Sequence, residues 1–170
     1  RGELAGDDVA TTAARNVHPS IAAAFERIDA NGDGDIAVDE SRSLVFISSH
    51  PSQTLAAVSY ATPNSPLVQG SVSLSKCSGS PYGVAYDPSQ NVVLVACHNL
   101  VVVNVSDPRN MSELGSTDVD TTYMVDPRAM CINASTSTAY VTGETSDSIA
   151  VVSYKQTAAP TITSWFISEM

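Results

Sequence analysis

The sequence predicts a mainly β protein in which a four-stranded antiparallel unit occurs three times, preceded by one short helix and an acidic loop. From residue 36 onward, β-branched runs alternate with turn-forming Asp, Pro, Ser, Asn and Gly residues, which is typical of short strands joined by hairpins. A unit of about 47 residues recurs along this stretch. Apolar residues follow helical spacing only before it, between residues 19 and 28.

Composition argues against a nucleic acid partner and against a transmembrane segment. The 170 residues carry 8 basic and 18 acidic side chains, a formal net charge of −10. With lysine only at Lys76 and Lys155, the chain offers no basic surface for phosphates, so we expect no nucleic acid partner. A hydrophobic fraction of 43% is sufficient for a core. No apolar run approaches the roughly 18 to 20 residues that cross a bilayer, so we expect no transmembrane segment.

The first 35 residues form two segments in this interpretation. Residues 1–17 are small and polar without periodicity, and we expect an arm. Residues 18–35 combine a helix with a loop. Ile21, Ala24, Phe25 and Ile28 follow i, i+3, i+4, i+7 spacing, which predicts one apolar stripe on a short amphipathic helix that ends at Asp29.

The loop after this helix is the sharpest motif in the sequence. It resembles an EF-hand loop, with oxygen-bearing side chains at its first, third and fifth positions, glycine at the sixth and glutamate at the twelfth. Hard oxygen ligands on an electronegative loop favour Ca²⁺. The alternative is an acidic surface turn without an ion, in which the clustered carboxylates would repel one another. The candidate ligands are Asp29, Asn31, Asp33, Asp35 through its carbonyl, and Glu40.

Glu40 differs from the other candidates, because the repeat makes residues 36–39 a strand rather than the helix that follows an EF-hand loop. An extended strand rises about 3.3 Å per residue and would carry Glu40 away from the ion. Both geometries remain open at this point. Because the loop replaces the link that enters the other two units, and because it is unpaired, we expect it to pin the helix to the first unit rather than to signal.

The three units span about residues 36–78, 79–126 and 127–170. Sliding the chain by 94 residues places Val58-Ser59-Tyr60 on Val152-Ser153-Tyr154, and a third copy lies halfway between. Each unit has a first strand that ends at Asp39, Asp87 or Asn133, a tight turn, two apolar strands and a weaker fourth strand. Four antiparallel strands in 40 to 50 residues is the size of one β-propeller blade.

Two stretches resemble known propeller repeats. Residues 100–110 read Leu-Val-Val-Val-Asn-Val-Ser-Asp-Pro-Arg-Asn, similar to the Leu-Val-Ile-Val-Asp repeats of surface-layer-type propellers. Ala139-Tyr-Val-Thr-Gly is similar to the related Tyr-Val-Thr-Asn repeats. The resemblance covers residues 36 to 168 and implies a propeller fold. Such a fold serves adhesion proteins, binding platforms, lactonases and other enzymes, so it does not by itself identify the function.

Three blades are too few to close a ring, which typically has four to eight. We therefore expect a partial ring that needs other protein chains, or a second copy of this chain, to complete it. Trp165 and Phe166 in the last unit are expected to pack between blades or to meet such a partner.

Four further features bear on chemistry and location. His50, His98 and Glu144 occupy equivalent turns and could form a metal site only if they converged. For Cys97 and Cys131 we expect buried apolar roles, with a bridge between them as the alternative.

The chain begins at Arg1 without a signal-peptide stretch, so we interpret it as processed or as part of a longer protein. Glycosylation sequons at Asn104, Asn110 and Asn133 favour an extracellular or cell-surface protein of the secretory pathway.

These observations favour a scaffold or adhesion module over an enzyme. We find no motif for nucleophilic catalysis in the sequence. A calcium-dependent, lactonase-like hydrolase is the first alternative, and a calcium-responsive regulatory subunit is the second.

Overall fold

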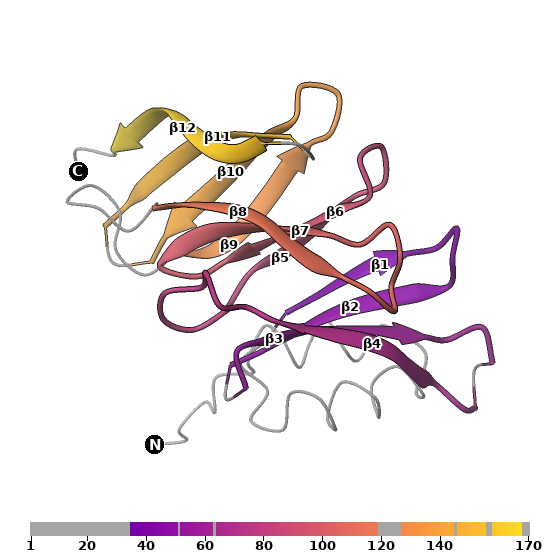
Figure 1. Ribbon diagram of the computed structural model, residues 1–170. Helices are drawn as coiled ribbons and strands as arrows, with labels where there is room; N and C mark the ends of the chain where they lie inside the picture. Colours follow the sequence, from indigo (N-terminus) through magenta and orange to yellow (C-terminus); the bar gives the residue numbers. More distant parts are fainter. Residues whose placement is uncertain are drawn as a thin grey trace, which may run out of the picture.

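The computed structural model describes residues 35–50, 52–62, 64–118, 127–144, 146–155 and 158–167. These residues form three four-stranded antiparallel sheets, each in chain order from first strand to fourth (Figure 1). The sheets are the first blade (β1–β4), the second blade (β5–β8) and the third blade (β9–β12). The strands are β1 Ile36–Asp39, β2 Leu44–Ser49, β3 Thr54–Ser59, β4 Leu67–Ser73, β5 Val84–Asp87, β6 Val92–Ala96, β7 Asn99–Asn104, β8 Ser112–Asp118, β9 Pro127–Asn133, β10 Thr138–Gly143, β11 Ser148–Lys155 and β12 Ala158–Ile167.

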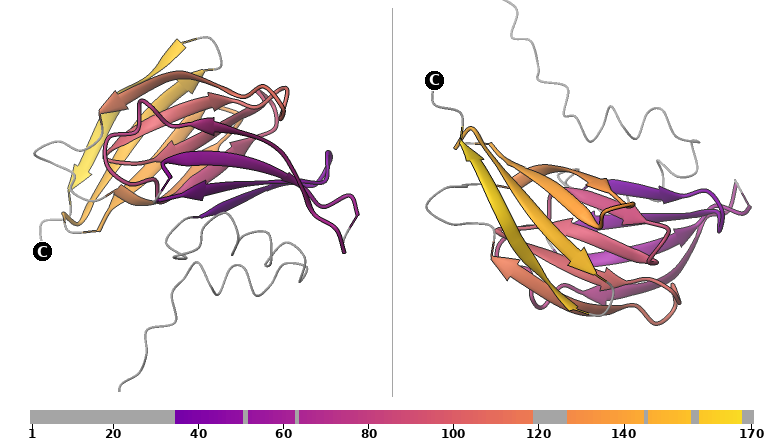
Figure 2. Two further views of the ribbon diagram at one scale, coloured as in Figure 1. Left: turned by 60° about the horizontal axis from the view of Figure 1, so that its bottom comes forward. Right: turned by 90° about the horizontal axis from the view of Figure 1, so that it is seen from above.

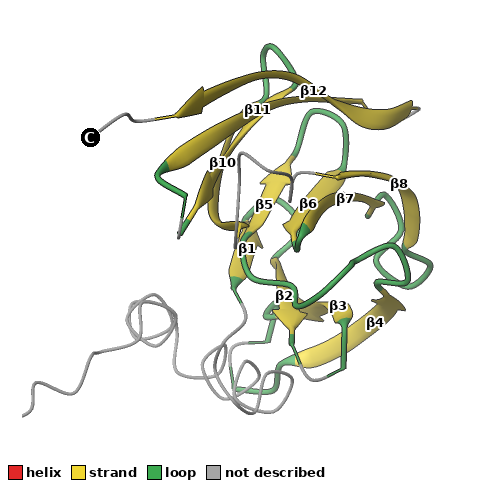
Figure 3. Ribbon diagram, turned by 90° about the vertical axis from the view of Figure 1, so that its left-hand side faces the viewer, coloured by secondary structure: helices red, strands yellow, loops and turns green. Residues whose placement is uncertain are grey.

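The expected fold class is confirmed, with three separate blade-like sheets and only strands and loops in the described residues (Figure 3). The proposed arm at residues 1–17 and the proposed helix and loop at residues 18–34 lie outside these residues. The side chains of Trp165 and Phe166 also lie outside what the structure describes, although both residues belong to β12.

The repeat is visible in the backbone. The turn of the first hairpin in each blade ends in a residue with left-handed backbone: Ser43, Asn91 and Ser137 all have φ of 52°. Each third strand also meets its fourth strand with a register shift at an equivalent position, after Ala57, Val102 and Val151. Such a shift bends a strand and increases its twist. The three units therefore share the same local departures from regular strand geometry as well as the same strand order.

Two apolar layers hold the sheets together. The second blade lies between the other two (Figure 1, Figure 2). On β6, Val93 and Val95 face the first blade, whereas Val92, Leu94 and Ala96 face the third, and all five are fully buried. A strand covered on both faces has no exposed side to place polar residues on, which explains its unbroken apolar sequence.

The first strands of the blades lie next to one another. β1 contacts β5, and β5 contacts β9, whereas no hydrogen-bonded pairing joins one described sheet to another. This arrangement, with the first strands together and the sheets stacked face to face, is that of consecutive blades around a partial ring. In each blade we call the face turned toward the next blade in chain order the leading face, and the opposite face the trailing face.

Candidate functional site

The leading face of the third blade differs from the same face of the other two. Strand pairing makes Phe46, Leu94 and Tyr140 equivalent on the second strands of the blades, and Leu55, Leu100 and Ile149 equivalent on the third strands. In the first two blades these side chains have 0% exposure, because the next blade covers them. In the third blade Tyr140 is 38% exposed and Ile149 is 40% exposed. The position and apolar character are retained, but no described sheet covers these two side chains.

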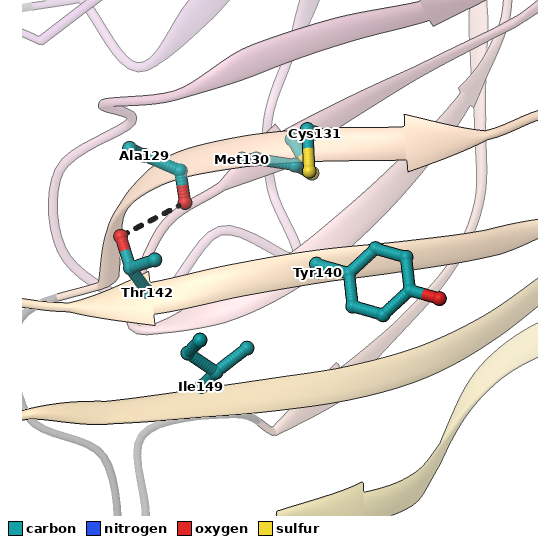
Figure 4. Close-up of a pocket in the computed structure, with 6 residues that line it drawn as sticks. All are labelled: Ala129, Met130, Cys131, Tyr140, Thr142 and Ile149. Atoms are coloured by element: carbon teal, nitrogen blue, oxygen red, sulfur yellow. Dashed lines mark hydrogen bonds between the residues drawn. The ribbon is translucent and has the colours of Figure 1, made fainter. Parts of the chain in front are cut away.

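This surface, which we call the open face, forms a shallow apolar depression (Figure 4). The Thr142 hydroxyl turns back to the sheet and donates to the Ala129 carbonyl at 3.3 Å. The hydroxyl is therefore already engaged, and little polar surface remains to hold water. The lining residues are Ala129, Met130, Cys131, Tyr140, Thr142 and Ile149.

The trailing face of the first blade is closed, in contrast to the open face. Val45 and Ile47 have 0% exposure, and Ala56 and Val58 have 4% and 1%. These four residues belong to neither of the two inter-blade apolar layers. The two ends of the blade stack are thus unequal in the described residues: the outer face of the first blade is buried, whereas Tyr140 and Ile149 on the outer face of the third blade are exposed.

A polar contact between blades one and two lies at the end where β1 meets β2. Arg42 makes an ion pair with Asp39, and its terminal nitrogens donate to the Val105 carbonyl at 2.8 Å and to the Tyr86 hydroxyl at 3.0 Å. Burial alone raises the pKa of Asp39, but hydrogen bonds from Ser41, Arg42 and Tyr86 outweigh it and lower this pKa to about 2. The carboxylate therefore stays charged and holds the guanidinium across the blade boundary.

An equivalent polar contact joins blades two and three. Asp87 is fully buried, and the Tyr154 hydroxyl donates to it at 3.0 Å from the third blade. Gln90 also crosses the boundary and donates to the Ser137 hydroxyl at 2.8 Å. Burial raises the pKa of Asp87, but hydrogen bonds from Ser89, Tyr154 and Gln90 lower it overall. At the same place in the third blade stands the neutral Asn133, whose Oδ1 receives only local donors from its own turn in the described residues.

The cysteines pair differently from the sequence-based prediction. Cys77 and Cys97 form a disulfide between the link into the second blade and the turn after β6. Cys97 is buried as expected, but the alternative of a bridge to Cys131 is wrong. The buried role predicted for Cys131 is also wrong, because this thiol is free and exposed on the open face. The physical reason is that none of the described sheets packs on the leading face of β9.

The three equivalent turn residues lie at the end of the sheets where β1, β5 and β9 begin, but they do not form a metal site. His50 stacks on Tyr82 with ring centroids 6.4 Å apart, and the Arg128 guanidinium lies 4.1 Å from the centre of the Tyr82 ring. Glu144 pairs with Arg128 at 2.6 Å. Within the described ranges, no three His, Cys, Asp or Glu side chains gather to hold a metal, so His50, His98 and Glu144 stay apart.

The expected calcium ligands lie partly outside the described residues. Asp29, Asn31 and Asp33 precede the first described residue. The Asp35 carbonyl accepts the Ser48 amide at 3.1 Å, and its carboxylate accepts the amides of Ile36 at 2.8 Å and Val84 at 3.0 Å. Burial raises the pKa of Asp35, and these two amide hydrogen bonds partly offset that effect.

Glu40 lies beyond the far end of β1, in the turn that leads to β2. Five residues of extended chain separate it from Asp35 by about 16 Å. Calcium ligands lie only about 2.3 to 2.6 Å from the ion, so Asp35 and Glu40 cannot share one site. Of the two geometries left open by the sequence, the structure has the strand.

Sequence reasoning missed the polar contacts between blades. The repeat aligns Asp39 with Asp87 and Tyr60 with Tyr154. A repeated acid at the end of a strand and a repeated tyrosine at the end of another were the available signals. What the sequence did not show is that the Tyr154 hydroxyl reaches the preceding blade rather than its own.

Comparison with known proteins supports the fold and leaves the family open. No family model and no curated protein matches the sequence. A protein from Lactobacillus plantarum is similar with a TM-score of 0.66 and 23% identity, over 79% of this chain and 42% of its own. The periplasmic gluconolactonase of Pseudomonas aeruginosa is similar with a TM-score of 0.62 and 10% identity, over 78% of this chain and 38% of its own. A chain of the nidogen/laminin complex is similar with a TM-score of 0.52 and 18% identity, over 75% of this chain and 46% of its own.

These similarities show a β-propeller-like fold, and the identities are too low to show more. The chain spans less than half the length of each of these structures. The part of the chain that the structure describes contains no helix long and apolar enough to cross a membrane. The chain is thus similar to part of larger propeller-like proteins.

Proposed function

We propose that this chain is a calcium-stabilised β-propeller segment that acts as an extracellular or cell-surface scaffold or interaction module within a larger assembly. The open face of the third blade is the observation that carries this proposal. Tyr140 and Ile149 keep large apolar side chains at positions that the next blade buries in the first two blades. A contiguous apolar surface of this kind on a folded protein marks a site of protein contact.

The proposed calcium ion would stabilise the entry to the first blade. Asp29, Asn31 and Asp33 supply side-chain oxygens in the sequence, and the Asp35 carbonyl is a further candidate that the ion would share with the Ser48 amide. A carbonyl oxygen has two lone pairs and can serve both. The Asp35 carboxylate also holds the Val84 amide of the second blade. Order at the loop would therefore be transmitted to the first two blades.

The proposed location rests on the disulfide and the sequons. Disulfides persist in oxidising compartments and are rare in the cytosol, which favours a secreted or surface protein for the Cys77–Cys97 pair. Asn110 and Asn133 are exposed, and Asn104 lies at the end of β7 with partial exposure. These positions leave room for glycans.

Differential scanning calorimetry with Ca²⁺ and with a chelator tests the proposal. At free Ca²⁺ about 100 times the dissociation constant, binding to the folded state adds about 2.7 kcal/mol of stability. For a chain of this size the melting temperature should then rise by roughly 5 to 10 °C. The control is the Asp29→Ala, Asp33→Ala variant, which should lose the calcium-dependent rise. A melting temperature that ignores calcium in the natural chain would refute the calcium part of the proposal.

The same samples distinguish a stabilising ion from a calcium-responsive regulator. A stabilising ion leaves the shape of the chain unchanged. A regulator exposes apolar surface when calcium binds. Sedimentation velocity and binding of an apolar dye should therefore be equal with and without calcium under native conditions, and a calcium-dependent increase in dye binding would favour the regulator.

A lactonase-like hydrolase is the second candidate function. The similarity to the gluconolactonase of Pseudomonas aeruginosa favours it. The Arg128 guanidinium, which lies over Tyr82 at one end of the stacked sheets, is the candidate side chain for binding the lactone. Arg128 is 45% exposed and is already paired with Glu144, so it is accessible but partly neutralised. Hydrolysis of gluconolactone by the natural chain, abolished in the Arg128→Ala variant, would support the enzyme. Equal rates with and without the protein would exclude this substrate.

A further inference from the structure

We infer that the open face accepts one further four-stranded sheet, not a second copy of this chain, and that the docking side of this partner sheet carries valine and alanine on its two central strands. The inference rests on the proposed interaction role and specifies the partner. It follows from how the blades of this chain already pack on one another.

Both observed blade interfaces share one feature on their central strands. Large side chains of the leading face, Phe46 and Leu55 in the first blade and Leu94 and Leu100 in the second, pack in the same layer as valine or alanine of the next trailing face, with Tyr154 as a larger residue at the end of β11. The second blade places Val93, Val95, Val101 and Val103 against the first blade. The third blade places Ala139, Val141, Ala150 and Val152 against the second. The open face carries Tyr140 and Ile149 at the receiving positions, so a trailing face of valine and alanine is the surface that continues this interface.

A second copy of this chain does not meet the requirement. Ring closure by two copies would place the trailing face of one first blade on the open face of the other third blade. That trailing face is already buried, since Val45 and Ile47 have 0% exposure in the chain alone. Packing two open faces together would be leading against leading, a contact that neither observed interface uses.

Cys131 is a built-in reporter of this docking. It is exposed, it lies on the open face, and the other two cysteines are joined in a disulfide. A sheet seated on the open face must cover this thiol. The rate at which N-ethylmaleimide alkylates Cys131 therefore reports whether the face is covered, without any substitution in the face.

The probe is an extended chain in which a second copy of residues 74–118, the second blade with its entering link, follows Met170. This copy brings its own disulfide and its own valine face. We expect alkylation of Cys131 to slow by at least about tenfold, which corresponds to 1.4 kcal/mol of docking free energy. In the matched control, Val93→Asp and Val101→Asp are made in the appended copy alone, and the original rate should return. An appended blade that folds without slowing alkylation would overturn the inference.

A second measurement does not depend on folding of the appended blade. In the natural chain, Ile149→Thr should leave the melting temperature almost unchanged, because its side chain is 40% exposed and no sheet covers it. Leu100→Thr, at the equivalent and fully buried position of the second blade, should lower the melting temperature by several degrees. Equal losses in the two variants would show that the open face is already used within the chain and would overturn the inference.

Sedimentation of the natural chain measures its oligomeric state and so tests whether a second copy occupies the open face. We expect a monomer at all concentrations with calcium present. A dimer that Ile149→Asp abolishes would overturn the inference by making a second copy the partner. These results are independent of the calcium proposal. A chain that binds no calcium refutes that part of the function, whereas protection of Cys131 in the extended chain would still support the docking surface.

Discussion

Removing one hydroxyl group, in the Tyr154→Phe variant, tests how the second and third blades are joined. Tyr154 is 1% exposed, and its hydroxyl donates to the Asp87 carboxylate at 3.0 Å. Asp87 also receives the Ser89 amide at 2.8 Å, the Ser89 hydroxyl at 2.7 Å and the Gln90 amide nitrogen at 3.1 Å. The substitution therefore removes one of four donors and leaves the aromatic ring in its apolar layer.

The expected loss in free energy of unfolding follows from this geometry. A hydrogen bond to a charged group contributes about 1.5 to 3 kcal/mol, and no cavity is created because only the oxygen is lost. We expect a loss of about 2 kcal/mol, a large part of the 5 to 15 kcal/mol that holds a typical domain folded. With a urea m-value near 2 kcal/mol/M, the midpoint of unfolding should fall by about 1 M while the m-value stays constant.

Urea unfolding followed by circular dichroism measures this loss. Tyr140→Phe is the matched control, because Tyr140 is 38% exposed on the open face and should change the free energy of unfolding by less than about 0.5 kcal/mol. A double-mutant cycle with Asp87→Asn should give a coupling energy of about 1 kcal/mol or more between the two positions. A loss below 0.5 kcal/mol in Tyr154→Phe, or no coupling, would refute the role assigned to this contact.

Three further predictions concern stability. The Cys77→Ser, Cys97→Ser variant should lose about 3 kcal/mol in free energy of unfolding, because the disulfide closes a loop with a sequence separation of 20, and equal stability of oxidised and reduced protein would contradict this. Leu94→Ala should cost about 2 to 5 kcal/mol in urea unfolding, because the side chain is fully buried against the third blade, and a cost as small as that of a surface residue would place Leu94 outside the core. Asp39 and Asp87 have folded-state pKa values below the ordinary 3.8, about 2 for Asp39, so their contribution to the free energy of unfolding is complete above about pH 5 and is lost as pH falls toward 2. The free energy of unfolding of Asp87→Asn should therefore fall less steeply with acid than that of the natural chain. An unchanged slope would contradict the assignment.

The strands could be predicted from the sequence because their signals are local. Apolar runs, turn residues and the recurrence of the unit place the first strand ends at Asp39, Asp87 and Asn133, where the structure has them. The fourth strands had a weaker apolar pattern in the sequence. In the first blade the fourth strand is also the most exposed strand, and its Leu67 is 63% exposed. The apolar pattern of a strand reflects its burial rather than its strand propensity. An exposed outer strand is therefore harder to recognise in the sequence.

Contacts between blades were beyond the sequence because they depend on which turns meet in space. The Cys77–Cys97 bridge joins the link into the second blade to the turn after β6. Nothing in the sequence around either cysteine indicates that it pairs with the other. Likewise, nothing in the sequence distinguishes Cys131 from a buried strand residue, and it is exposed because no described sheet covers the open face. A partial ring was predictable from the number of blades. Only the structure identifies the side chains that a partial ring leaves exposed, among them Cys131.

Hydroxyl-radical footprinting of the natural chain, read by mass spectrometry, tests most directly whether two blade faces are covered and the third is open. Phe46 and Leu94 should resist oxidation, whereas Tyr140 and Ile149, at equivalent strand positions, should be oxidised readily. Protection of Tyr140 to the level of Phe46, or oxidation of Leu94 to the level of Tyr140, would contradict a stack of three blades that is open at one end.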